Sequence, residues 1–176
     1  MTFSVYFTAT KTNDESKVIS SVQVFEELTK FEPVIVETER ADGATFLDDE
    51  LEAFLLAMEV VVGEEFDDVV LYNQNKLLFD WLMKMSHESV LREAYYVKIK
   101  GLMQKAYIEN GTTIKSGVVK GKDNEAKTSL KKYMKNRGQD LQDLTSMFAG
   151  MEMENKQEKK KKGTGRVINL NNRRLG

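Results

Sequence analysis

The chain has 176 residues, of which 41% are hydrophobic and 31% are charged, a size and composition that fit one hydrophobic core plus an appendage. It contains no cysteine, which excludes disulfides, thiolate catalysis and cysteine-ligated zinc or iron–sulfur sites and favours a cytoplasmic setting. The first ten residues lack a basic and apolar leader, and no stretch approaches the roughly 20 apolar residues of a membrane helix. We therefore expect no membrane partner.

The small net charge of -2 hides a division along the chain. Residues 1–100 carry 20 acidic and 9 basic side chains, a net charge of -11, whereas residues 101–176 carry 8 acidic and 17 basic ones, a net charge of +9. This division is typical of an acidic body with a basic arm that binds nucleic acid, or with an arm that folds back on the body or on a second copy.

The N-terminal third predicts two strands with a helix between them. Apolar and polar residues alternate over residues 4–10, the pattern of a strand with one buried face. After a polar turn, Val18, Val22 and Phe25 recur at helical spacing, so we expect a helix that stops before Pro33. The β-branched run that follows Pro33 predicts a second strand over residues 33–38.

The middle third predicts the main helices. Apolar residues at spacings of three and four predict a helix over residues 46–62, with Thr45 as its N-terminal cap. Residues 69–72 fit either a strand or a helix. The segment 77–109 has the densest apolar content, and it predicts two helices, or one kinked helix with a break at 86–89, that supply the middle of the core.

The composition changes after Gly111. Residues 112–122 indicate a hairpin or linker, residues 124–137 a basic helix that ends at Gly138, and residues 140–151 a second short helix. We therefore expect an α+β fold, a small sheet packed by several helices, with a flexible basic tail. The predicted divisions are a globular α+β domain over 1–111, a basic helical extension over 112–151 and a disordered tail over 152–176.

Three motifs are weak candidates for a chemical site. The stretch from Gly117 to Lys122 resembles a phosphate-binding loop, but it is one residue short, and Asp123 stands where a metal-binding hydroxyl belongs. The acidic residues at 64–68 miss the spacing of a calcium loop. His87 is the only histidine, and no nucleophile is marked out beside it. The sequence therefore predicts no catalytic residue, no metal site and no cofactor, and hence a protein that is not an enzyme.

Two segments are candidate binding sites. The apolar patch on 140–151 lies on a segment too short to be fully buried, so we expect it to bind either the body of the chain or another protein as a helix in a groove. Its residues are Leu144, Met147, Phe148 and Met151. The basic tail either binds phosphate backbones, through counterion release, or is a solvated tail with no function. Its cationic residues are Lys159, Lys160, Lys161, Lys162, Arg166, Arg173 and Arg174.

An acidic, partly helical body followed by a lysine run at 159–162 and a low-complexity peptide resembles the tail assembly chaperones of tailed bacteriophages. The resemblance implies that the lysine run reflects a slippery messenger site, with residues 163–176 read when no frameshift occurs. It also implies a non-catalytic protein that binds tape-measure and tail-tube proteins in the host cytoplasm, with self-association left open. Two alternatives stand beside it: a nucleic-acid-associated accessory factor that uses the basic arm, and an acidic inhibitor of a host enzyme.

Overall fold

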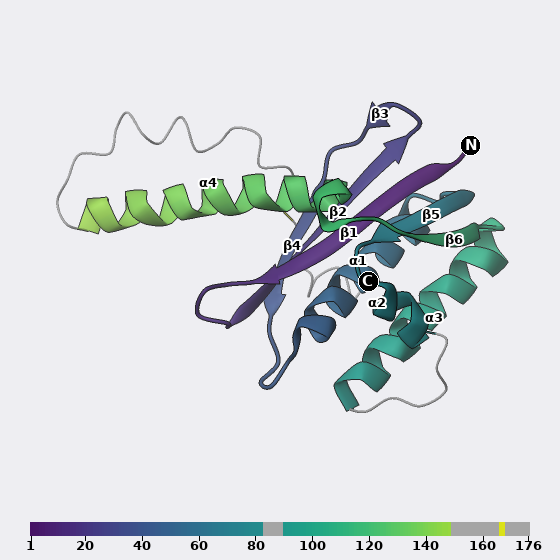
Figure 1. Cartoon of the computed structure of the whole chain (residues 1–176), viewed down its shortest axis with the longest axis horizontal. Helices are drawn as coiled ribbons and strands as arrows, with labels where there is room; N and C mark the ends of the chain where they lie inside the picture. The colour runs from purple at the N-terminus through teal and green to yellow at the C-terminus, as the bar shows by residue number, and fades with distance from the viewer. Residues whose placement is uncertain (83–89, 149–165, 168–176) are drawn as a thin grey trace.

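A mixed sheet forms the centre of the molecule (Figure 1). The structure is a computed structural model that describes residues 1–82, 90–148 and 166–167, with side chains up to residue 138. The strands run in the order β6-β5-β1-β2-β4-β7, with β3 paired to β2. Their bounds are Phe3–Lys11 (β1), Lys17–Glu26 (β2), Thr29–Lys30 (β3), Val34–Glu39 (β4), Asp68–Asn73 (β5), Thr113–Val118 (β6) and Arg166–Val167 (β7).

Helices cover both faces of this sheet. In Figure 1, α4 crosses one face and α1 passes behind the sheet on the other, while α2 and α3, which pack on α1, are seen at the lower right. The helices are α1 (Phe46–Gly63), α2 (Lys76–Leu82), α3 (Val90–Asn110) and α4 (Glu125–Phe148), with a short 3-10 turn, η1 (Gly121–Asp123), before α4. The predicted α+β class is confirmed. Within the described residues, no helix is both long enough and apolar enough to cross a membrane.

The larger core lies between the sheet and α1. Phe7 of β1 and Leu51, Phe54 and Met58 of α1 are all inaccessible to solvent, as the alternation in β1 and the helical spacing in α1 require. The prediction that residues 77–109 supply the middle of the core is correct only in part: Leu78, Trp81 and Leu82 of α2 and Ile99 of α3 belong to the core. In α3 only Ile99 and Ala106 are buried, because this helix packs on the outer side of α1.

The helix predicted after the first turn is instead strand β2. This strand pairs with β1 on one side and with β4 on the other. Val22 packs toward α1, while Ile19 packs toward α4 with Ile35 of β4. Because both faces of β2 are covered, its sequence lacks the polar and apolar alternation of a half-exposed strand, and the helical reading of its valines is wrong.

The region after Gly111 continues the same sheet. Residues 113–118, predicted to lie in a hairpin or linker, form β6, which pairs in parallel with β5. The two helices predicted around Gly138 are one helix, α4, which runs through that glycine. The predicted break at 86–89 lies outside the described residues. The three predicted divisions of the chain stay predictions.

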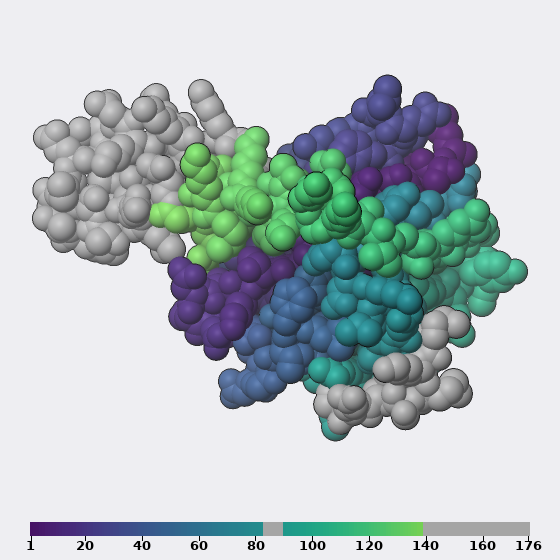
Figure 2. Space-filling view, in the orientation of Figure 1, coloured from purple at the N-terminus to yellow at the C-terminus, as the bar shows by residue number. Residues whose placement is uncertain are grey.

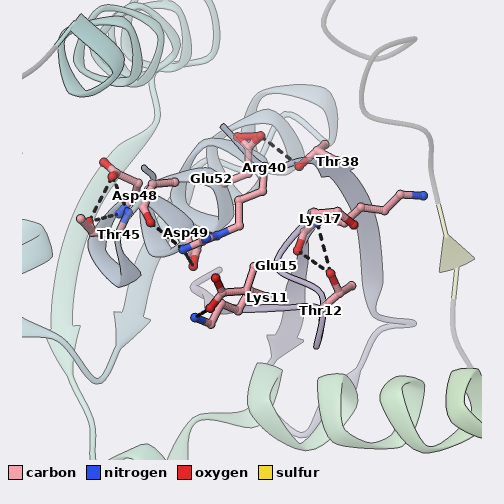
Figure 3. A network of polar contacts seen from close by, with 12 residues as sticks. Lys11, Thr12, Glu15, Lys17, Thr38, Arg40, Thr45, Asp48, Asp49 and Glu52 are labelled. Atoms are coloured by element: carbon pink, nitrogen blue, oxygen red, sulfur yellow. Dashed lines mark hydrogen bonds and ion pairs between the residues drawn. The ribbon is translucent and has the colours of Figure 1, made fainter. Parts of the chain in front are cut away.

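The first turn of α1 is fixed by a polar network (Figure 3). Thr45 caps the helix as predicted, through reciprocal bonds with Asp48. Arg40, just after β4, donates from Nε to Asp49 Oδ1 at 2.9 Å, and Arg92 of α3 pairs with Asp48 at 3.2 Å. The two aspartates also lie near the positive end of the helix dipole. This network therefore fixes the start of α1 relative to both the sheet and α3.

Gly117 of β6 is required by a close approach of Tyr72. A Cβ atom at this position would lie 2.7 Å from Tyr72 Cε1, and the Tyr72 ring is itself stacked on Tyr6 with centroids 4.8 Å apart. We expect Gly117→Ala to lower the free energy of unfolding by about 1–3 kcal/mol in urea titrations. Gly101→Ala in α3, where a Cβ meets nothing within 4 Å, is the matched control and should be neutral or stabilising by up to about 1 kcal/mol. Equal effects of the two changes would contradict this account of Gly117.

Candidate functional site at the carboxyl ends of strands β1 and β5

The site begins where two parallel strands separate. Strands β1 and β5 pair only from Phe3 with Val69 to Tyr6 with Tyr72. Beyond that point β1 continues beside β2, while β5 ends at Asn73. Ligand sites of sheets with parallel strands lie outside such carboxyl ends. A polar cluster occupies this position.

Glu50 of α1 is the centre of the cluster. Its side chain is 0% exposed and accepts three side-chain hydrogen bonds. Thr8 donates to Oε1 at 2.8 Å, Asn73 donates to Oε2 at 2.9 Å, and Gln74 donates to Oε1 at 3.3 Å. Burial raises the pKa of the Glu50 carboxyl, because it penalises the charged form more than these hydrogen bonds favour it.

Asn124 connects this cluster to α4. Its Nδ2 donates to Gln74 Oε1 at 2.7 Å and to the Phe7 carbonyl at 3.0 Å. Its Oδ1 accepts from the Ala126 backbone N–H at 3.0 Å, so Asn124 caps the first turn of α4. We name the five side chains the Glu50 cluster: Thr8, Glu50, Asn73, Gln74 and Asn124.

A cavity of about 390 Å³ opens beside the Glu50 cluster, between β1, α1 and α4. Its lining is mostly apolar, with Leu130 and Met134 of α4 and Phe46 of α1 on its walls. The Phe46 ring is 61% exposed. Lys127 and Lys131 of α4 also line this cavity, so cationic and aromatic groups meet beside the buried carboxylate.

The orientation of α4 places its lysines on the surface. Leu130 and Tyr133 pack on the sheet, and the Tyr133 hydroxyl donates to Glu37 of β4. Burial raises the pKa of Tyr133, and the bond to Glu37 adds to this effect. With that face against the sheet, Lys127 and Lys131 are exposed and lie one turn apart. Figure 2 shows α4 as a ridge on the face turned toward the viewer.

The fold matches solved structures, although no protein-family model and no curated protein matches the sequence. RNase H1 from the halophilic archaeon Halobacterium salinarum NRC-1 aligns with a TM-score of 0.57 and 18% identity over 72% of this chain and 91% of that chain. The N-terminal RNase H domain of rv2228c from Mycobacterium tuberculosis was solved as a fusion with maltose binding protein. It aligns with a TM-score of 0.57 and 13% identity over 72% of this chain and 92% of that chain. LC11-RNase H1 in complex with an RNA/DNA hybrid aligns with a TM-score of 0.55 and 13% identity over 70% of this chain and 88% of that chain. The chain therefore has an RNase H-like fold.

This likeness corrects the predicted class of protein. The resemblance to phage tail assembly chaperones rested on the order of segments and on a lysine run, and the match to RNase H1 structures contradicts it. The same match contradicts the prediction of a non-catalytic protein that is not an enzyme, since the fold is one that ribonucleases use. Tape-measure and tail-tube partners lose their support as well. The alternative prediction, a nucleic-acid-associated factor, agrees better with this fold.

The predicted binding residues are not part of the Glu50 cluster. The backbone of α4 includes Leu144, Met147 and Phe148, but side chains beyond residue 138 lie outside the description. Met151, the lysines at 159–162 and the arginines at 173 and 174 lie wholly outside it, and Arg166 is described only as backbone of β7. These residues stay predictions.

No residue of the Glu50 cluster was predicted from the sequence as part of a site. One signal was present in the predicted helix at 46–62. Glu50 follows Leu47 by three residues and precedes Phe54 by four, so a carboxylate lies on the apolar face of an amphipathic helix. A charged residue in that position is buried with partners or serves a site. The other four residues carried no comparable signal.

The RNase H-like fold raises the question of divalent cations, because many nucleases hold two metal ions with carboxylate ligands. The Glu50 cluster contains one carboxylate, and both of its oxygens already accept hydrogen bonds from side chains. Across the part of the chain that the structure describes, no three acidic or histidine side chains are grouped as metal ligands. The residues present do not fit a pair of divalent ions, and no chemical step through a metal follows from them.

The buried Glu50 carboxyl should make stability depend on pH. Its pKa is higher in the folded chain than in the unfolded chain, so folding favours the protonated form. This contribution is complete below the unfolded pKa of about 4.3 and is lost as pH rises through the folded pKa. We expect the stability of wild type relative to Glu50→Gln, from urea titrations at several pH values, to be highest at low pH and to fall as pH rises through the folded pKa. A difference that is constant with pH would contradict the assignment.

Proposed function

We propose that this chain binds double-helical nucleic acid, with an RNA/DNA hybrid as the first candidate, over the face that joins the Glu50 cluster to α4. The observation that carries the proposal is the position of Lys127 and Lys131, which are exposed and line the cavity beside Glu50. The fold supports it, since LC11-RNase H1 was solved in complex with an RNA/DNA hybrid.

The chemistry of this face suits a nucleic-acid backbone. Lysine ammonium groups attract phosphates and release condensed counterions, which supplies affinity without reading sequence. The half-open cavity adds the exposed ring of Phe46, and aromatic rings give bases or sugars an apolar surface to contact. The predicted tail lysines at 159–162 would add phosphate contacts of the same kind.

Fluorescence anisotropy tests the proposal, with a labelled RNA/DNA hybrid, duplex DNA and duplex RNA, each measured at low and at physiological salt. We expect the hybrid to bind and its affinity to fall as salt rises. A chain with its four lysines at 159–162 replaced by alanine separates the tail from α4, and it should retain binding. The absence of any binding, or binding that salt does not weaken, would rule out the proposal.

Hydrolysis of the bound strand is a second candidate function, favoured by the ribonuclease fold and by a carboxyl with a raised pKa at the ends of β1 and β5. A carboxyl can donate or accept a proton in such a reaction. The test incubates a labelled hybrid with wild type and with Glu50→Gln, with and without Mg²⁺. Product formed by wild type alone supports this function, whereas equal cleavage by both proteins, or none by either, contradicts it.

A further inference from the structure

The three amides of the Glu50 cluster have fixed orientations. The side-chain oxygen of Asn73 accepts from the Asn75 backbone N–H at 2.8 Å, and that of Asn124 accepts from the Ala126 N–H. The oxygen of Gln74 accepts from Asn124 Nδ2. Since each amide oxygen already has a donor, the NH₂ groups of Asn73 and Gln74 point at Glu50. An NH₂ group cannot ligate a cation, because it offers no lone pair.

Together these bonds form a continuous path. It runs from Glu50 on α1 through Gln74 after β5 to Asn124, and from Asn124 to the first turn of α4. Asn73 and Asn124 both donate to the Phe7 carbonyl, at 2.8 and 3.0 Å, which ties the path to β1. The polar atoms of the cluster are thus engaged with one another and with the backbone.

We infer that the Glu50 cluster is a hydrogen-bond relay that positions the basic helix α4 relative to the sheet and does so without a divalent cation. In this relay the carboxylate is the acceptor at which the donors of Thr8, Asn73 and Gln74 converge, and Asn124 transmits their arrangement to α4. The relay and the proposed function share only one element, the helix α4, which carries Lys127 and Lys131. Its tests use no nucleic acid, so either can fail while the other stands.

The first test measures cation binding by the full chain, with Mn²⁺ followed by electron paramagnetic resonance and Mg²⁺ by thermal shift. We expect wild type to bind neither ion and to keep its melting temperature. The double variant Asn73→Asp and Asn124→Asp replaces two amides by carboxylates of the same shape. It should melt at a lower temperature without metal and gain Mn²⁺ binding.

Mn²⁺ binding by wild type that is lost in Glu50→Gln would overturn the cation-free assignment. A double variant that folds, as judged by circular dichroism, and still fails to bind Mn²⁺ would contradict the claim that the neutral amides exclude the ion. The single change Asn73→Asp, which leaves the cap of α4 intact, serves if the double variant does not fold.

The second test addresses the positioning of α4 by hydrogen exchange of its backbone amides. Asn124→Ala removes both the link to Gln74 and the helix cap, so the amides of the first turns of α4 should exchange roughly two- to thirtyfold faster. Thr128→Ala, an exposed change on the same helix, is the control and should leave exchange unchanged. Asn124→Asp keeps the cap but not the donor to Gln74, and it should give an intermediate increase. Unchanged exchange in Asn124→Ala and Asn124→Asp would overturn the relay.

Discussion

Reversing two charges on α4, with Lys127→Glu and Lys131→Glu together, should weaken binding of an RNA/DNA hybrid and make the remaining binding less sensitive to salt. Both lysines line the cavity beside the Glu50 cluster, and each phosphate contact contributes about one unit to the slope of log affinity against log salt. We expect that slope to fall by about 2, measured by anisotropy titrations over a series of salt concentrations.

The control for this prediction carries the same charge change on the other side of the molecule. Lys98 and Lys105 are exposed on α3, which lies across the sheet from α4 (Figure 1). Lys98→Glu with Lys105→Glu alters the net charge equally, so it reports the effect of overall charge alone. If both double variants lose the same affinity and the same salt slope, α4 is not the binding face.

Replacing Glu50 by alanine should cause the largest loss of stability among the polar changes in this chain. The change leaves the buried donors of Thr8 and Asn73, and the half-buried donor of Gln74, without their shared acceptor, and it opens a cavity beside α1. Unsatisfied buried donors and a cavity together predict a loss of about 2–4 kcal/mol in the free energy of unfolding. Urea titration followed by the fluorescence of Trp81 measures it.

Asp42→Ala, an exposed acidic position before α1, is the comparison for this loss, and its effect should stay within about 0.5 kcal/mol. If Glu50→Ala were as stable as Asp42→Ala, the carboxylate would not hold the cluster together. Stabilisation by Glu50→Ala would show that the buried charge costs more than its hydrogen bonds return.

The elements whose sequences keep a regular apolar period could be predicted from the sequence, whereas strand β2, which lacks one, could not. Strand β1 alternates and α1 shows helical spacing, so both were found near their observed bounds. Strand β2 is covered on both faces, which removes the alternation that marks a strand. Gly138 was read as a helix end, but α4 continues through it, because a single glycine costs a helix only about 1 kcal/mol.

The Glu50 cluster could not be predicted because the sheet topology assembles it. Thr8, Glu50 and Asn124 are widely separated in the sequence and belong to no motif. Parallel pairing of β1 with β5 places Asn73 and Gln74 near Thr8, and the packing of α1 and α4 on β1 adds Glu50 and Asn124. A local feature of the sequence instead indicated the wrong class of protein. The lysine run at 159–162 is visible without any fold, and it supported a class of protein that the RNase H-like fold contradicts.

Chemical-shift mapping tests the proposed nucleic-acid interface most directly. The ¹⁵N-labelled chain would be titrated with an unlabelled RNA/DNA hybrid, and the backbone amides would be followed by nuclear magnetic resonance. We expect the largest changes in β1 near Thr8, at Gln74, and along α4 at Lys127 and Lys131. Changes confined to α3, or to residues beyond α4, with those positions unaffected, would contradict it.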